Sequence, residues 1–129
     1  YIKKFANRHN KKIICIGHYS NIADKNVICN PLYVFSYFKN ADYVITDTFH
    51  GTVVSLVSNA EFVTKISGNG NKLTFLLEQY GVTERRANTF EDIPDITSKK
   101  IDYEAVNSKI EEIRARSVNF LVSALGEKI

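Results

Sequence analysis

The residues of this sequence best suited to chemistry lie together between positions 47 and 51. They follow a short apolar run that ends at Thr46, and they read Asp47, Thr48, Phe49, His50 and Gly51. The imidazole of His50 can exchange a proton near neutral pH or donate a hydrogen bond to an anion. A helix that begins here would also present unpaired N–H groups and a partial positive charge, which suit a phosphate or a carboxylate. The segment is our first candidate site.

A purely structural interpretation of the same segment stays open. Asp47 or Thr48 can serve as the N-cap of the helix, or can orient the histidine. His50 can be a satisfied residue between packed elements, and Gly51 permits close approach of either backbone or ligand. The spacing alone does not separate the two interpretations.

A second polar loop covers residues 67–72, between an apolar run and an amphipathic segment. It matches neither GxGxxG nor GxxxxGK[ST], so neither nucleotide-binding motif is present. One interpretation is a turn that caps the next helix. The other is a ligand-facing loop in which Ser67 contacts the ligand and Lys72 supplies positive charge. Lys65, just before the loop, is a further cation unless its side chain points to solvent.

Three residues elsewhere extend the candidate set. Arg85 and Arg86 can reach an anion or a partner domain, although arginines that follow a helix are usually solvated. His18 follows the first predicted strand, where it is placed to form a wall of the same cleft. No spacing gives His18 a specific role.

Other site chemistry is not visible in the sequence. It has no nucleophile elbow, paired-carboxylate spacing or zinc motif, and we predict neither a metal nor a cofactor. Cys15 and Cys29 lie in apolar stretches and are expected to be buried free thiols, with a disulfide between them left open. The net charge of +3 argues against nucleic-acid binding, and no apolar run is long enough to span a membrane.

These loops are held by an alternation of strands and helices. In the first half, residues 13–17 predict a buried strand and the first of the sheet, residues 27–29 a second short strand, and residues 43–46 a third. Asn30 and Pro31 predict the start of a helix that ends near Asn40. This helix is expected to bury Leu32, Phe35 and Phe38. Residues 51–58 are rich in β-branched side chains, but a short buried helix entered at residues 49–51 is preferred over a strand.

The second half predicts one more strand and two helices. Residues 61–66 form the strand, and Leu73, Leu76, Leu77 and Tyr80 recur at helical spacing before Gly81. Residues 84–100 are expected to form a surface connection. A last helix begins at the capping residue Asp102 and ends at Gly126. Its apolar stripe is formed by Val106, Ile110, Ile113, Phe120, Leu121 and Leu125.

Strands that alternate with helices predict the α/β class, with a Rossmann-like parallel sheet covered by helices on both faces. Ligands of such sheets bind beyond the carboxyl ends of the strands, where both polar loops fall. The 129 residues, 44% of them hydrophobic, suffice for a single domain spanning residues 1–129. Because the opening residues read like a helix already under way, we expect the C-terminal part of a longer two-domain protein.

The stretch from Ala41 to Val53 resembles the polysaccharide pyruvyl transferase family, whose members carry a similar Phe-His-Gly segment after a strand. The likeness covers residues 30–125 and includes an ordered series of further segments. These are Phe62-Val63, Lys72-Leu73 with residues 76–82, Arg85 or Arg86, Ile101-Asp102-Tyr103, and Arg116-Ser117 with Phe120-Leu121.

The resemblance implies the fold of the two-domain B-type glycosyltransferases, with this chain as the second half and inactive alone. It implies transfer of an enolpyruvyl group from phosphoenolpyruvate to sugar hydroxyls in exopolysaccharide or cell-envelope synthesis. The partners would then be a small donor, a glycan acceptor and the N-terminal domain, in the cytoplasm or at the inner face of the membrane. His50 would contact the donor or act as the acid that helps phosphate leave, and N–H groups near Phe49 and His50 would bind donor oxygens.

One position departs from the family pattern. Well-studied members of the family place an arginine two residues before the histidine, whereas this sequence has Thr48. A neutral side chain loses a charge-assisted contact with the donor. Lys65, Lys72 or a residue of the other half would replace that contact. A nucleotide-sugar glycosyltransferase half and a non-catalytic domain that binds a glycan or a partner remain alternatives.

Overall fold

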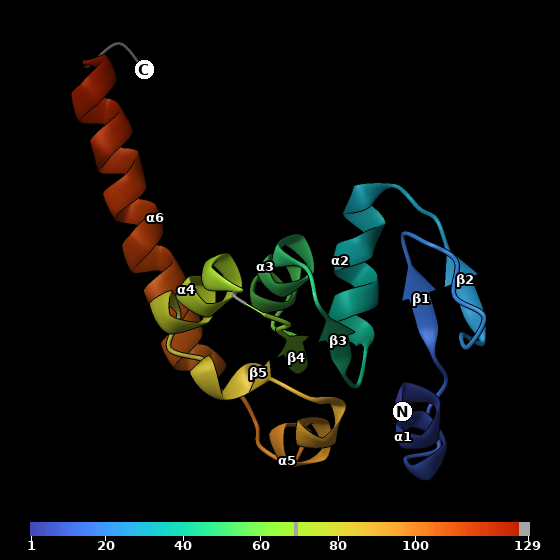
Figure 1. Ribbon diagram of the computed structural model, residues 1–129. Coiled ribbons are helices and arrows are strands. Elements are labelled where there is room, and N and C mark those ends of the chain that lie inside the picture. The colour runs from blue at the N-terminus through green and yellow to red at the C-terminus, as the bar shows by residue number, and fades with distance from the viewer. Residues whose placement is uncertain (69, 127–129) are drawn as a thin grey trace.

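The computed structural model describes residues 1–68 and 70–126 as an α/β arrangement with two parallel sheets (Figure 1). The elements of the first half are α1 (Ile2–Arg8), β1 (Ile14–Ile16), β2 (Lys25–Val27), α2 (Pro31–Asn40), β3 (Val44–Thr46) and α3 (Phe49–Val57). Those of the second half are β4 (Phe62–Lys65), α4 (Asn71–Gln79), η1 (Thr83–Arg85), β5 (Arg86–Ala87), η2 (Phe90–Asp92), α5 (Ile93–Thr97) and α6 (Tyr103–Leu125).

The sheet that carries the candidate loops has three strands in the order β3-β4-β5, all parallel. Thr46 pairs with Thr64, and Thr64 pairs in turn with Arg86. Because the strands are parallel and in register, the loops that follow them leave from one edge. The parallel α/β class predicted from the sequence is therefore confirmed.

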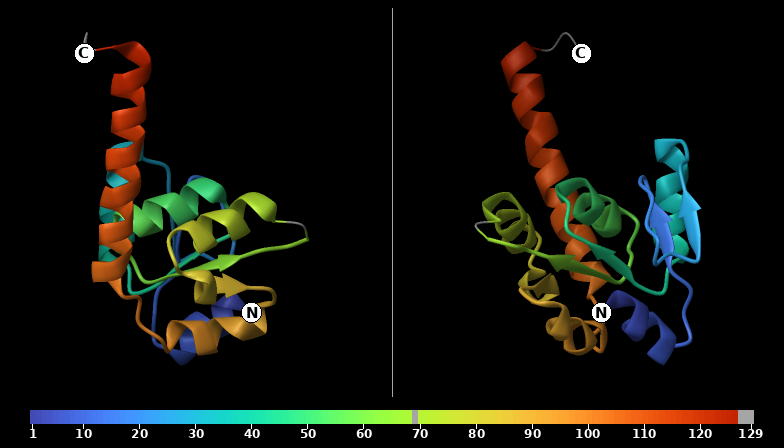
Figure 2. Two further views of the ribbon diagram at one scale, coloured as in Figure 1. Left: turned by 90° about the vertical axis from the view of Figure 1, so that its left-hand side faces the viewer. Right: turned by 45° about the vertical axis from the view of Figure 1, so that its right-hand side comes forward.

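The side chains of β4 alternate between two helical layers, as a pleated strand requires. Phe62 packs into a core formed with α3, α4 and the start of α6, whereas Val63 packs against α1 and α5. The first core contains Val44, Leu56, Ala60, Phe62, Ile66, Leu76, Leu77, Val82, Ile101 and Val106. The second contains Phe5, Val63, Ala87, Ile93 and Ile96. Helices thus cover both faces of the sheet, as expected (Figure 2).

The first strand is not part of this sheet, contrary to the prediction. β1 pairs only with β2, in a separate parallel sheet of two strands that lies apart from β3 in Figure 1. The strand is also not buried, since 47% of Ile14 is exposed. A sheet of two strands offers too little area to enclose an apolar run, so a hydrophobic sequence alone overestimates burial here. β2 lies at Lys25–Val27, two residues before the predicted position.

Most helix boundaries follow the predicted signals. The side chain of Asn30 accepts a hydrogen bond from the N–H of Leu32 at the start of α2, and Asp102 accepts one from Ala105 at the start of α6. The ambiguous β-branched segment is the helix α3, and Gly126 follows α6. The backbone of Gly81 has a φ of +69°, which suits a glycine after α4.

Two apolar stripes are less buried than predicted. α2 has no buried residue, and 76% of Leu32 and 39% of Phe35 are exposed. On α6 only Val106 is buried, and Figures 1 and 2 show the C-terminal half of the helix extending away from the rest of the chain. An apolar stripe indicates a face that packs when a neighbour is present, but it does not supply the neighbour.

The predicted surface connection at residues 84–100 is wrong. It contains η1, β5, η2 and α5, and it contributes part of the core. Its buried residues are Arg85, Ala87, Ile93, Ile96 and Thr97. The elements are too short to produce a helical or alternating pattern, so their burial was hidden among polar neighbours.

Candidate functional site

Thr48 fixes the N-terminus of α3 at the carboxyl end of β3. Its hydroxyl oxygen accepts a hydrogen bond from the N–H of Gly51 at 3.0 Å, which makes Thr48 the N-cap. The hydroxyl of Thr46 accepts from the N–H of Thr48 at 3.2 Å and lies 3.2 Å from the Thr48 hydroxyl. Thr48, the position where the sequence departed from the resembled pattern, is thus a helix cap in this chain.

Gly51 is required by packing. A Cβ at this residue would lie 2.1 Å from Oγ1 of Thr46 and 2.8 Å from Oγ1 of Thr48. Both distances are far below van der Waals contact. The glycine therefore lets the first turn of α3 sit against the end of β3, and the group that approaches it closely is the Thr46 side chain.

The remaining residues of this turn face outward. Phe49 and His50 are exposed, and their rings meet edge to face with centroids 6.0 Å apart. Within residues 1–68 and 70–126, no acceptor pairs with their backbone N–H groups or with the imidazole of His50. Asp47 is also exposed and makes no hydrogen bond to His50 there, so the predicted orientation of the histidine by Asp47 is not found. His50 is available to a ligand.

The loop after β4 adds polar groups to the same edge. Nζ of Lys65 donates to Oγ of Ser67 at 2.9 Å and lies 5.4 Å from the centre of the Phe90 ring. Lys72 lies in the first turn of α4, exposed to solvent, and Asn69 of this loop lies outside the described residues. Gly70 occupies the N-cap position of α4 without a capping side chain. No side-chain hydrogen bond therefore supports the interpretation that this loop caps α4.

The pleat of the sheet places Lys65 of β4 and Arg86 of β5 on opposite faces. Val63 faces α1 and α5, and Lys65, two residues on, follows the same face toward Phe90. Thr64 faces the other way, toward α3, where its hydroxyl meets Thr52. Lys65 therefore lies on the opposite face of the sheet from the first turn of α3.

Arg86 is the cation on the face of α3 and α4, and it is one of the two arginines that the sequence offered as anion ligands. Its guanidinium donates from Nε to the Asn88 side chain at 2.8 Å and from Nη1 to the hydroxyl of Thr74 at 3.0 Å. In the described part of the chain no carboxylate lies within ion-pair distance of it. A half-buried guanidinium held by two neutral acceptors is a fixed positive charge beside the first turn of α4.

The neighbouring Arg85 has a different role from the one expected. Only 1% of it is exposed, so the predicted solvated surface arginine is wrong. Nη1 donates to the carbonyl of Ile96 at 3.2 Å, Nη2 donates to that of Lys99 at 2.6 Å, and Nη1 lies 3.6 Å from Oε2 of Glu61. Arg85 ties the end of α5 to the start of β4. The sequence Arg-Arg gave no sign of which side chain turns inward.

Asp92 shapes the loop that follows β5. One carboxylate oxygen accepts hydrogen bonds from the N–H groups of Asn88 at 2.9 Å and Thr89 at 2.8 Å. These backbone hydrogen bonds hold the pKa of Asp92 below its ordinary value. The loop carries both Asn88, which fixes Arg86, and Phe90, which contacts Lys65.

His18 is not at this edge. It follows β1, in the separate sheet of two strands, and its imidazole contacts Cys15. Both Cys15 and Cys29 are free thiols, partly exposed rather than buried. None of these contacts supports the expectation that His18 lines the same cleft as residues 47–51.

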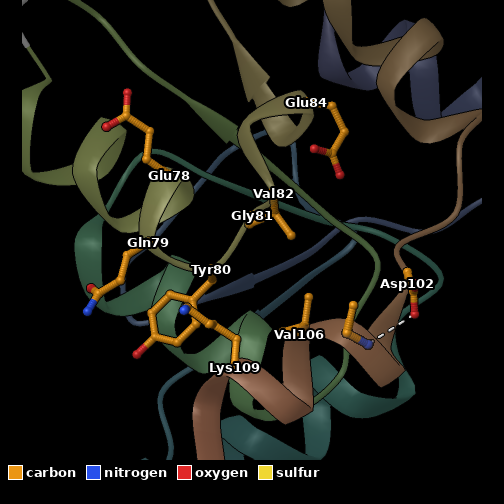
Figure 3. A pocket seen from close by; sticks show the side chains of 10 residues that line it. Glu78, Gln79, Tyr80, Gly81, Val82, Glu84, Asp102, Val106 and Lys109 are labelled. Carbon is orange, nitrogen blue, oxygen red and sulfur yellow. Dashed lines mark hydrogen bonds between the residues drawn. The ribbon is translucent and has the colours of Figure 1, made fainter. Parts of the chain in front are cut away.

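One hollow lies at the other end of the sheet. It has a volume of 340 Å³ and is bounded by the end of α4, the segment before β5 and the start of α6 (Figure 3). Its polar lining residues are Glu78, Gln79, Tyr80, Glu84, Asp102 and Lys109. None of the predicted site residues lines it.

In residues 1–68 and 70–126, no three His, Cys, Asp or Glu side chains are grouped so that they could hold a metal ion. In the same residues, no helix combines the length and the apolar character needed to cross a membrane. No protein-family model, curated protein or solved structure matches the chain.

Proposed function

We propose that this chain is the donor-binding half of a polysaccharide pyruvyl transferase-like enzyme that uses phosphoenolpyruvate. The observation that carries the proposal is the exposed first turn of α3. There, His50 and two unpaired N–H groups stand at the carboxyl edge of a parallel sheet. Such edges are where α/β proteins bind ligands, and the N–H groups of a first helical turn donate hydrogen bonds to anions. The sequence resemblance of residues 41–53 names the class of reaction.

The charge missing at Thr48 is supplied in this proposal by Arg86. Its guanidinium is fixed in place by Asn88 and Thr74, on the face of the sheet that carries α3 and α4. A planar guanidinium recognises both carboxylate and phosphate through paired N–H groups. Phosphoenolpyruvate carries one group of each kind. Ser67, in the loop before α4, and Lys72, in the first turn of α4, are the further donor-binding residues of this proposal.

The reaction forms two carbon–oxygen bonds at C2 of phosphoenolpyruvate and breaks the bond from C2 to the phosphate oxygen. Two sugar hydroxyls add to C2, one of their protons ends on C3 as part of a methyl group, and the other leaves with phosphate. In this proposal His50 hands a proton to the departing phosphate. The product is a ketal pyruvate on the glycan.

The glycan acceptor and the facing wall of the cleft are assigned to the N-terminal domain of the same protein. On this proposal the reaction takes place in the cytoplasm, or at the inner face of the membrane when the acceptor is lipid-linked. No metal or cofactor is assigned to the reaction.

The test is calorimetric titration of the intact protein with phosphoenolpyruvate. Loss of one hydrogen bond to a charged group costs about 1.5–3 kcal/mol, so His50→Ala and Arg86→Gln should each weaken binding by roughly tenfold or more. The matched control is His9→Ala, since His9 is an exposed histidine that ends α1 and should leave the affinity unchanged.

Two results would overturn the proposal. Binding of a nucleotide sugar but not of phosphoenolpyruvate would favour the glycosyltransferase alternative. Failure of both ligands to bind the intact protein would favour a non-catalytic domain that recognises a glycan or a partner. Release of inorganic phosphate from phosphoenolpyruvate, dependent on an added glycan, would directly support the proposed transferase reaction.

A further inference from the structure

A cysteine and a histidine are in contact at the end of β1, outside the site described above. Sγ of Cys15 lies 3.4 Å from Nε2 of His18 and 3.3 Å from the carbonyl oxygen of His18. Cys15 is partly exposed and His18 is exposed. Neither residue has a part in the proposed transfer reaction.

The contact depends on the backbone of Gly17. Side chains three residues apart on a straight strand point to opposite faces, so an extended chain would keep Cys15 and His18 apart. Gly17 has a φ of +88°, a conformation that a side chain would disfavour, and its N–H donates to the carbonyl of Val27 at 3.0 Å. The chain turns at the glycine, and the imidazole returns over the thiol.

The pair has the geometry of an activated nucleophile. A thiol becomes reactive as the thiolate, and an imidazole within hydrogen-bonding distance can accept its proton. The second thiol, Cys29, makes no such contact with a histidine in the described residues. The two cysteines of one chain therefore differ in the feature that governs thiol chemistry, which provides an internal comparison.

We propose that Cys15 and His18 form a reactive thiol site that exchanges with low-molecular-weight disulfides. The thiol proton passes to Nε2 of His18, and the thiolate attacks one sulfur of the disulfide. A sulfur–sulfur bond forms to Cys15, the original sulfur–sulfur bond breaks, and the departing thiolate takes the proton. Cys15 and one half of the small disulfide then form a mixed disulfide, and the other half leaves as a thiol.

The experiment follows mixed-disulfide formation with oxidised glutathione at pH 7 by intact-protein mass spectrometry. Single-cysteine variants of the intact protein, Cys29→Ser and Cys15→Ser, report the rates of Cys15 and Cys29 separately. We expect Cys15 to react about tenfold faster than Cys29. His18→Gln should slow Cys15 to the rate of Cys29 and should leave Cys29 unchanged.

Gly17→Ala provides an independent variant, because it keeps both side chains but disfavours the turn that joins them. It should slow Cys15 as His18→Gln does. In urea the rates of Cys15 and Cys29 should converge, since the contact exists only in the folded chain. Equal rates for the two thiols in the folded protein would overturn the proposal, and so would a Cys15 rate that neither substitution changes.

Discussion

The hydroxyl oxygens of Thr52 on α3 and Thr64 on β4 lie 2.9 Å apart, and both residues are fully buried. The Thr52 hydroxyl donates to the carbonyl of Thr48 at 2.9 Å, so the proton shared between the two threonines belongs to Thr64. This chain of two hydrogen bonds links the cap of α3 to the central strand. It ties the first turn of the candidate site to the most buried part of the sheet.

We expect Thr52→Val to destabilise the protein more than Thr64→Val. The first substitution leaves the buried Thr64 hydroxyl without an acceptor, which costs about 1–3 kcal/mol. After the Thr64→Val substitution, the Thr52 hydroxyl still donates to the carbonyl of Thr48. The double variant should lose less than the sum of the two, because no unpaired hydroxyl remains. Urea unfolding of the four proteins gives the coupling. Strict additivity would show that the hydroxyls do not act together.

Gly51→Ala is predicted to move or destabilise the first turn of α3. The added methyl group would overlap the Thr46 side chain, and forced overpacking of this kind costs about 1–3 kcal/mol. Combining it with Thr46→Ala removes the atom in closest conflict and should recover part of the loss. The free energies of unfolding of the single and double variants measure this recovery. A Gly51→Ala protein as stable as the wild type would contradict the packing role given to this glycine.

Arg85→Met should be among the most destabilising single substitutions in this chain. It removes both donors to the carbonyls of Ile96 and Lys99 and leaves Glu61 without its cation. Breaking one side of a buried ion pair costs about 3–5 kcal/mol. Arg86→Met is the adjacent control, because that guanidinium is half-exposed and bonds only neutral acceptors. Thermal unfolding should therefore separate the two variants clearly, and similar losses would argue against the ion pair.

Tyr103 is predicted to make the stability fall at alkaline pH. Its hydroxyl donates to the carbonyls of Ala60 and Ser55, and burial, with the Glu61 charge adding to it, raises the pKa of the phenol well above its ordinary value. Above about pH 10 the unfolded phenol ionises while the folded one stays neutral. Unfolding then releases a proton, so a higher pH favours the unfolded state. Below that pH the contribution of Tyr103 is complete.

Tyr103→Phe removes this pH dependence together with the two hydrogen bonds. The wild type should exceed the variant in stability by a constant amount up to about pH 10, and the difference should shrink at higher pH. Urea unfolding at matched pH values isolates the effect, since every other tyrosine and lysine is common to both proteins. A difference that stays constant above pH 10 would show that the phenol ionises equally in both states.

Local signals in the sequence were sufficient for much of the fold. Caps are decided by one side chain and the backbone beside it, so Asn30 and Asp102 could be placed at helix starts without knowledge of the rest. The strand–helix alternation fixed the parallel α/β class for a similar reason. The loop at residues 47–51 was found because three signals coincide there: a strand end, a helix start and a histidine.

Burial and side-chain orientation that depend on residues distant in the sequence could not be predicted from it. Leu32 and Phe35 recur at helical spacing, but whether this part of α2 is covered depends on elements far along the chain. Arg85 is buried because two carbonyls at residues 96 and 99 and the Glu61 carboxylate surround it, and no spacing encodes that meeting. The same limit applies to Arg86: the sequence offered it as an anion ligand, but its orientation depends on Thr74 and Asn88.

The exposed C-terminal half of α6 is expected to affect how the protein self-associates in solution. Beyond Ile113 the helix carries a series of apolar side chains in water, namely Val118, Phe120, Leu121, Val122 and Leu125. At 1.5 Å per residue, residues 114–125 amount to about 18 Å of helix with apolar groups on several sides. Exposed apolar area of this kind promotes self-association. Light scattering from the 129 residues in isolation should rise with protein concentration, and Phe120→Ser with Leu125→Ser should suppress the rise.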